Sequence, residues 1–280
     1  MKVISLILSG LFISLLASSQ TVNYEVYVLK YTSLAHPSTA SEQAKATSVK
    51  DSMHVDFMVW LLKGNNGKNI LTDAGFLYGV DEANDFNGIN YLKPDSAMQS
   101  TAIQPQDITD IILSYHHVED FDYKNVFPNA HIWIQKYDYT YFTQTSWQKG
   151  GQNAAYNRKS VQNLIELNNT GRLTFSDEAG KEIIPGIKLY ITAGEKFSPQ
   201  YLVVKSASAN IFLGSDNVWL YYNLDHTAPP TYGAFNAGSY IQDMQMMKNL
   251  VFDVKFIPDG QDASLFSRFP LATEGVIKVK

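Results

Sequence analysis

Apolar runs alternate with polar, turn-forming segments along most of the chain, and this pattern predicts several strands. Asn23–Tyr31 is rich in β-branched and aromatic residues, which favours a strand. His54–Phe76 reads as a strand, a turn at Asn65-Asn66-Gly67 and a second strand, which is the pattern of a β-hairpin. The apolar run Ile108–Leu113 has the length of a buried strand. These segments form the first of two groups of strands.

The second half of the chain carries helices as well as strands. Apolar residues recur at helical spacing in Asn153–Leu167 and in Ser239–Leu250, where the apolar face is rich in Met and Leu. Strands are predicted at Arg172–Asp177 and Ile187–Thr192, and a hairpin is predicted over Tyr201–Asp216. Two groups of strands, each followed by helices, predict a layered domain of mixed α/β class.

Composition narrows the class of protein. The chain has 280 residues, of which 45% are hydrophobic, and this is enough for one large core. The formal net charge of -5 argues against a nucleic-acid-binding surface. The absence of cysteine excludes disulfides, thiolate zinc sites and a cysteine nucleophile. The sequence also lacks a Gly-x-Ser-x-Gly elbow, a Gly-rich phosphate loop and a dinucleotide fingerprint.

The first 19 residues have the pattern of a secretory signal peptide. Lys2 precedes the mostly apolar run Val3–Leu16, and Ala17-Ser18-Ser19 has the small residues of a cleavage site. We therefore expect residues 1–19 to be removed and residues 20–280 to form a single domain that is exported to the periplasm or the medium. An N-terminal membrane anchor is the alternative, although the run is short for a spanning helix, and no later run is long and apolar enough to span a membrane.

Candidate chemistry gathers directly after the predicted buried strand, where the chain reads LSYHHVEDF. Tyr115 and His117 are two residues apart, so they point to the same side of an extended segment. Glu119 and Asp120 follow at once. A phenol, an imidazole and two carboxylates can therefore meet at one strand end, which is a common place for binding or catalytic groups.

This stretch resembles the metal-binding loop of the metallo-β-lactamase superfamily, in which His-x-His-x-Asp-His follows a buried strand. The corresponding frame here is Tyr115-x-His117-x-Glu119-Asp120, and the flanking segments "DITDIILS" and "NVFPNAHIWIQKYDY" also match. Asp73-Ala74-Gly75 fills the family's Asp-x-Gly element at the end of the opening hairpin. The N-acyl homoserine lactonase-like branch is the most similar. The resemblance implies the four-layer αββα sandwich of the metallo-β-lactamase fold, with two facing mixed sheets, over residues 24–270.

The resemblance also places the remaining metal-ligand positions of the family. Glu195 stands where the third histidine is expected, Asp216 matches the bridging aspartate, and Gln261 is the best match for the last histidine. His117 and Asp216 are thus the unchanged ligands, and Glu119 is a conservative replacement of an aspartate. Four histidines are replaced, by Tyr115, Asp120, Glu195 and Gln261.

The same comparison suggests which residues line the cleft. Trp219 stands where lactonases carry a tyrosine, and Tyr222 is a further candidate for an aromatic wall. His226 follows in a loop that lines the substrate cleft in the family. Ordinary packing and surface roles are the alternative for these side chains.

The replaced ligands change the metal chemistry that the site can support. Catalytic zinc favours imidazole ligands with one open position, so the replacements should weaken an ordinary two-zinc site. Oxygen donors suit hard cations such as calcium, magnesium or manganese, and a phenol with carboxylates also suits ferric iron. Three states therefore remain open: a site without metal, a site rebuilt for another cation, and residual zinc binding.

Two classes of function follow from this. The sequence favours a non-catalytic or strongly altered homologue that binds a small molecule, for example an acyl-lactone-like ligand, or a metal in the old cleft. The alternative is a metal-dependent hydrolase of lactones or other esters, in which Asp120 or Glu119 would protonate the leaving alkoxide.

Overall fold

The computed structural model describes ten stretches of the chain, and every structural statement below concerns these residues. They are 21–45, 48, 50–76, 88–114, 125–149, 158–191, 200–214, 218–231, 237–250 and 260–279.

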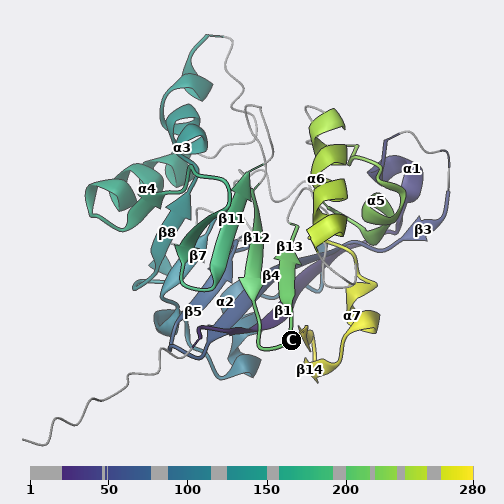
Figure 1. The fold of residues 1–280 in the computed structure, drawn as a ribbon, viewed down its shortest axis with the longest axis horizontal. Helices are drawn as coiled ribbons and strands as arrows, with labels where there is room; N and C mark the ends of the chain where they lie inside the picture. The colour runs from purple at the N-terminus through teal and green to yellow at the C-terminus, as the bar shows by residue number, and fades with distance from the viewer. Residues whose placement is uncertain are drawn as a thin grey trace, which may run out of the picture.

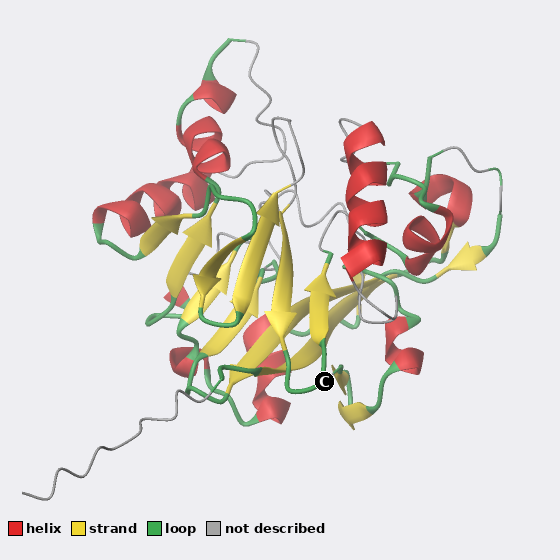
Figure 2. Cartoon of the chain, viewed as in Figure 1, coloured by secondary structure: helices red, strands yellow, loops and turns green. Residues whose placement is uncertain are grey.

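Two large sheets lie face to face (Figures 1 and 2). The larger sheet has nine strands in the order β14-β15-β1-β4-β5-β7-β8-β9, with β6 paired to β1. Its strands are β1 (Tyr24–Leu34), β4 (Asp56–Gly64), β5 (Asn69–Thr72), β6 (Gly88–Ile89), β7 (Asp110–Ile112), β8 (His131–Ile134), β9 (Leu173–Phe175), β14 (Leu271–Thr273) and β15 (Val276–Lys278). The smaller sheet contains β10 (Lys181–Ile184), β11 (Ile187–Ile191), β12 (Gln200–Lys205) and β13 (Asn210–Leu213).

Short elements and helices complete the described structure. A small ribbon pairs β2 (Ser38–Thr39) with β3 (Ser52–Met53). The helices are α1 (Ala40–Gln43), α2 (Pro94–Met98), α3 (Lys136–Thr143), α4 (Arg158–Asn169), α5 (Tyr221–His226), α6 (Ala237–Leu250) and α7 (Leu265–Arg268). Turns of 3-10 helix occupy Gln99–Thr101, Pro105–Asp107 and Thr145–Trp147.

Strand β4 shows why the sheets form layers. Met58, Trp60 and Leu62 belong to the core between the two sheets, whereas Val59 and Leu61 belong to the core on the opposite face. Successive residues of a strand point to opposite faces, so an apolar run in β4 buries side chains in both layers. Burying this apolar surface on both sides is the main force that joins the layers.

Helices cover the two outer faces. Met98 of α2, Phe142 of α3 and Leu164 of α4 pack in the core on the outer side of the larger sheet. Met246 of α6 packs on the outer side of the smaller sheet, where its sulfur lies 3.6 Å from the hydroxyl of Tyr201 in β12. The order of layers is therefore helix, sheet, sheet, helix, as the resemblance implied, and the hairpin of β4 and β5 around Gly67 is confirmed as well.

The strand pairing of the larger sheet changes from antiparallel to parallel at β5, and this change defines the edge at which the candidate site lies. Strands β15, β1, β4 and β5 are antiparallel neighbours, whereas β5, β7, β8 and β9 run parallel. The carboxyl ends of parallel strands lie at one edge of a sheet. The segments that follow β5, β7 and β8 therefore start from the same edge.

One sequence expectation is wrong in detail, and two features were not predicted. The smaller sheet is antiparallel rather than mixed, because strands that follow one another in the chain pair as neighbours and run in opposite directions. Strand β9 belongs to the larger sheet, and the unpredicted strand β10 is the partner of β11. The hairpin of β14 and β15 near the C-terminus was also not predicted. The predicted helix over 153–167 is described from Arg158 to Asn169.

No helix in the described stretches is long and apolar enough to cross a membrane.

Asp138 is a buried carboxyl group in the first turn of α3. Its side chain is 3% exposed, and the oxygen Oδ1 has no hydrogen-bond partner among the described residues. Burial raises the pKa of Asp138 from 3.8 to about 8. The folded protein therefore holds this proton more tightly than the unfolded chain does.

Replacing Asp138 by Asn should make the protein more stable at alkaline pH. The folded-state pKa of Asp138 is raised, so the wild type should lose stability as pH rises from about 4 to about 8. The melting temperature of Asp138→Asn should equal that of the wild type below pH 4 and exceed it by roughly 10 °C or more at pH 9. Asp225→Asn, at an exposed aspartate of α5, is the matched control. Equal melting temperatures of Asp138→Asn and wild type across this pH range would contradict the assignment.

Candidate functional site

The candidate site lies where several strand ends meet at one edge of the sandwich. Strand β7 ends just before the segment 115–124, which carries the predicted metal-binding loop. Strands β11 and β12 flank the segment 192–199, and β13 precedes 215–217. The described residues at these ends contact one another, so the geometry of the edge can be built from them.

Ser114 is held at the end of β7 by Asp73. The backbone N–H of Ser114 donates to Asp73 Oδ1 at 2.7 Å, and its hydroxyl donates to Asp73 Oδ2 at 2.5 Å. Asp73 has a φ of 61°, a left-handed conformation that aspartate tolerates better than most residues. Its own N–H donates to the carbonyl of Ile112 at 3.0 Å. The resemblance placed Asp73 in an Asp-x-Gly element at the end of the opening hairpin, and the structure shows that its carboxylate binds Ser114.

Gln200 fastens the smaller sheet to the same strand end. Its backbone N–H donates to the carbonyl of Ser114 at 2.8 Å, and its side-chain Nε2 donates to the carbonyl of Leu113 at 2.9 Å. The hydroxyl of Ser176, just beyond β9, donates to Gln200 Oε1 at 3.3 Å. Gln200 is 1% exposed, so these hydrogen bonds satisfy an amide that has almost no access to water.

Ile191 pairs with Gln200 across β11 and β12. Ile191 and Gln200, the described residues on either side of 192–199, therefore lie close to Ser114, the last described residue before 115–124.

Gln261 and Trp219 lie side by side near the start of β4. The N–H of Gln261 donates to the carbonyl of Trp219 at 3.1 Å, and the N–H of Asp56 donates to the carbonyl of Gln261 at 2.9 Å. Asp56 begins β4, which runs antiparallel to β5, so it lies at the same edge as the end of β5. Trp219 and Gln261 are both half-buried.

Asp262 fixes this part of the edge. Its Oδ2 accepts the backbone N–H of Tyr221 at 3.1 Å, at the first turn of α5, and its Oδ1 accepts the N–H of Ser264 at 2.8 Å. One carboxylate therefore joins the start of α5 to the segment that contains Gln261.

Tyr222 and His226 contact each other on α5. Their rings stack with centroids 4.1 Å apart, and His226 Nδ1 lies 3.1 Å from the carbonyl oxygen of Tyr222. Tyr222 is half-buried and His226 is exposed. The structure thus brings these two predicted cleft residues together.

The other predicted site residues lie outside the described residues. They are Tyr115, His117, Glu119, Asp120, Glu195 and Asp216. Within the stretches that the structure describes, no group of three His, Cys, Asp or Glu side chains is arranged to hold a metal ion. Metal binding therefore stays a prediction.

Sequence reasoning did not identify Ser114, Gln200 or Asp262 as parts of the scaffold. A polar residue directly after a buried strand was the available signal for Ser114. The partners of Gln200 and Asp262 are distant in sequence, so no local pattern could reveal them.

Comparisons with known proteins support the fold. No protein-family model and no curated protein matches the sequence. Among solved structures, a quorum-quenching N-acyl homoserine lactone lactonase is 18% identical, with a TM-score of 0.64 over 88% of this chain and 95% of that chain. A probable metal-dependent hydrolase from Staphylococcus aureus is 11% identical, with a TM-score of 0.68 over 86% of this chain and 90% of that one. The hydrolase AbOPH of the beta-lactamase superfamily is 14% identical, with a TM-score of 0.58 over 81% and 85%.

These identities are low, but the similarity covers most of both chains in each pair. The order of layers, helix, sheet, sheet, helix, agrees with it. The chain therefore has the metallo-β-lactamase fold, in a form like that of lactonases and other hydrolases.

Proposed function

We propose that this protein is an exported, strongly altered homologue of the lactonase-like hydrolases that binds a small ligand or a hard cation in its strand-end cleft. One observation carries the proposal: oxygen-bearing side chains replace four of the family's ligand histidines, while the scaffold beneath them is kept. The replacements are Tyr115, Asp120, Glu195 and Gln261. The hydrogen bonds between Asp73 and Ser114 represent the scaffold.

The donor set does not fit the family's zinc site. Zinc in catalytic sites is held mainly by imidazole nitrogen, and His117 is the sole histidine at the seven ligand positions. We therefore derive no hydrolytic step through zinc. The carboxylates at positions 119, 120, 195 and 216 are instead of the type that calcium or manganese prefers.

An enzyme with such an oxygen-rich cation site is the second candidate. It is favoured by the number of carboxylates at the old ligand positions, because these would repel one another without a counter-charge. Under either candidate, Trp219 and Tyr222 would form part of the wall for an apolar group of the ligand, and His226 would lie near its entrance.

A divalent cation should stabilise the folded protein if the carboxylates converge. Calcium or manganese at about 100 times its Kd would add about 2.7 kcal/mol to the free energy of unfolding, which raises the melting temperature by roughly 5–10 °C. Glu195→Gln should weaken this response and raise the melting temperature of the cation-free protein, because it removes one repelling charge. Glu166→Gln, at an exposed glutamate of α4, is the matched control.

The melting series should use protein purified without chelator, with its metal content measured by elemental analysis. A wild-type midpoint that no cation shifts would exclude the cation site and leave binding of a small ligand as the function.

Lactonase activity should be weak even when zinc is added. We expect kcat/KM for an N-acyl homoserine lactone to fall more than about tenfold below that of a family member with all its histidines. Tenfold corresponds to only about 1.4 kcal/mol of activation free energy, which is less than the loss of a zinc-bound nucleophile should cost. A value within tenfold of the complete enzyme would restore the lactonase interpretation.

The contact between Asp73 and Ser114 should be important for stability. Asp73→Ala removes two hydrogen bonds and places alanine at a φ of 61°. The free energy of unfolding should fall by about 3 kcal/mol in chemical denaturation. Ser114→Ala, which keeps the backbone hydrogen bond, should cost about half as much. Asp225→Ala at an exposed site of α5 should change the stability by less than about 0.5 kcal/mol. A similarly small effect of Asp73→Ala would show that this contact does not hold the strand end.

A further inference from the structure

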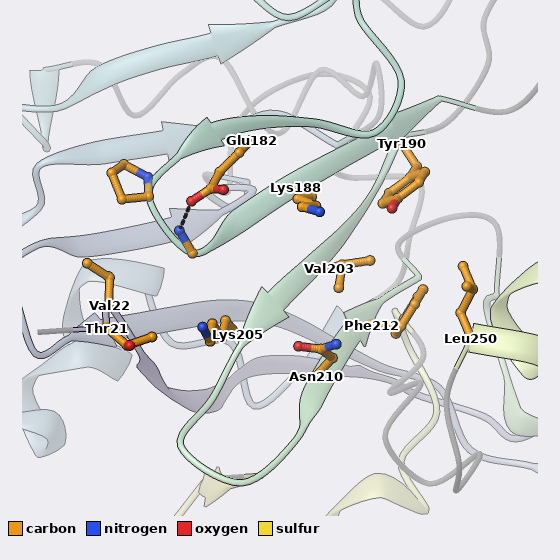
Figure 3. Close-up of a pocket in the computed structure, with 12 residues that line it drawn as sticks. Thr21, Val22, Glu182, Lys188, Tyr190, Val203, Lys205, Asn210, Phe212 and Leu250 are labelled. Atoms are coloured by element: carbon orange, nitrogen blue, oxygen red, sulfur yellow. Dashed lines mark hydrogen bonds between the residues drawn. The ribbon is translucent and has the colours of Figure 1, made fainter. Parts of the chain in front are cut away.

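A hollow lies on the outer face of the smaller sheet (Figure 3). Its volume is about 680 Å³, within the usual range of about 300–1,000 Å³ for small-molecule pockets. The floor is formed by β11, β12 and β13. Leu189, Leu202, Val204 and Ile211 point into the core, so the alternate side chains of these strands point into the hollow.

One half of the hollow is cationic. Lys188 of β11 and Lys205 of β12 are both exposed and line it, together with Asn210 of β13. Neither lysine forms an ion pair with a described residue. Glu182 is the acidic residue of the lining, and its Oε1 accepts the backbone N–H of Gly186 at 2.6 Å. The lining therefore carries two positive charges and one negative charge, a net charge of +1, on a chain whose formal net charge is -5.

The other half is apolar. Val203 is half-buried, Phe212 is 2% exposed, and Leu250 at the end of α6 is 51% exposed. The Tyr190 ring stacks on the ring of Tyr201 with centroids 5.2 Å apart and an interplanar angle of 6°. Figure 3 shows the two halves in one view: Lys205 lies on the side toward Thr21, whereas Phe212 and Leu250 lie on the opposite side. The hollow thus has a charged end and an apolar end.

We propose that this hollow binds a medium-chain carboxylate. The head group would lie between Lys188 and Lys205, with Asn210 as a further hydrogen-bond donor, and the chain would lie over Val203 and Phe212 toward Leu250. The single negative charge of a carboxylate balances the net charge of +1 on the lining. A head group with two negative charges would leave the hollow with a net negative charge and would be repelled by Glu182. The apolar floor adds affinity for each methylene that it covers. This site is separate from the strand-end cleft and does not depend on the function proposed for it.

Calorimetric titration of the protein with decanoate, below its micellar concentration, tests both halves of the hollow. Acetate has the same head without the chain, and decyltrimethylammonium has the same chain with the opposite charge. We expect the affinity of each of these two probes to be at least roughly tenfold lower than that of decanoate. Hexanoate should bind with intermediate affinity because its chain covers less of the apolar floor. Equal binding of the cationic and anionic probes, or no saturable binding of decanoate to the wild type, would overturn the proposal.

Variants then locate the site. Lys188→Gln combined with Lys205→Gln should weaken decanoate binding by roughly tenfold, whereas Lys181→Gln, at an exposed lysine of β10 outside the hollow, should leave it within about twofold. Leu250→Asn, at an exposed position, should weaken decanoate by roughly threefold and hexanoate less, because the shorter chain does not reach Leu250. Melting curves would verify that each variant is folded.

Two other outcomes would assign the hollow differently. Unchanged decanoate affinity in the double lysine variant would place the ligand in the strand-end cleft. A ligand-free dimer that dissociates in Leu250→Asn, seen by sedimentation, would show that a second copy of the chain covers the hollow. Either result would contradict a carboxylate site on this face.

Discussion

The hydrogen bonds of Gln200 join the two sheets at the edge that carries the candidate site. Its side chain donates to the carbonyl of Leu113, just after β7, and accepts the hydroxyl of Ser176 beyond β9, while its backbone N–H donates to the carbonyl of Ser114. An amide that is 1% exposed must find its partners inside the protein, because an unsatisfied buried amide costs free energy on the order of 1–3 kcal/mol. The hydrophobic core holds the sheets together without fixing direction, and these directional bonds set how their ends align.

Asp73 extends this alignment to the hairpin of β4 and β5. It accepts both donors of Ser114 while its own N–H donates to Ile112, so the end of β5 is locked to the end of β7. Asp262 does the same for the segment that contains Gln261 by accepting the first-turn N–H of α5. Side chains that act on backbone groups at strand and helix ends thus define the edge.

Two surfaces with opposite chemistry result from the same fold. Under the proposed function, the carboxylates, the phenol and the amide at the predicted ligand positions would suit the strand-end edge to a cation or a polar ligand. The outer face of the smaller sheet presents Lys188 and Lys205 beside an apolar floor, and it is suited to an anion with a chain. Alternation along β11 and β12 separates this face from the core, so the polar face can vary while the core face is kept.

The sequence by itself determined the elements whose signals are local. The turn at Gly67 predicted the hairpin of β4 and β5, the apolar run before Ser114 predicted β7, and helical spacing predicted α6. The replacement of the ligand histidines stays a prediction, which rests on the sequence and the resemblance alone. Only the tertiary structure decided that β9 joins the larger sheet while β10 joins the smaller one, that Asp138 is buried, and that Lys188 and Lys205 share a hollow. It also decided the partner of the Gln200 side chain, which lies 87 residues away in sequence. Strand partners and buried contacts depend on which apolar faces meet, and that choice is made by packing between distant segments rather than by the residues of any one segment.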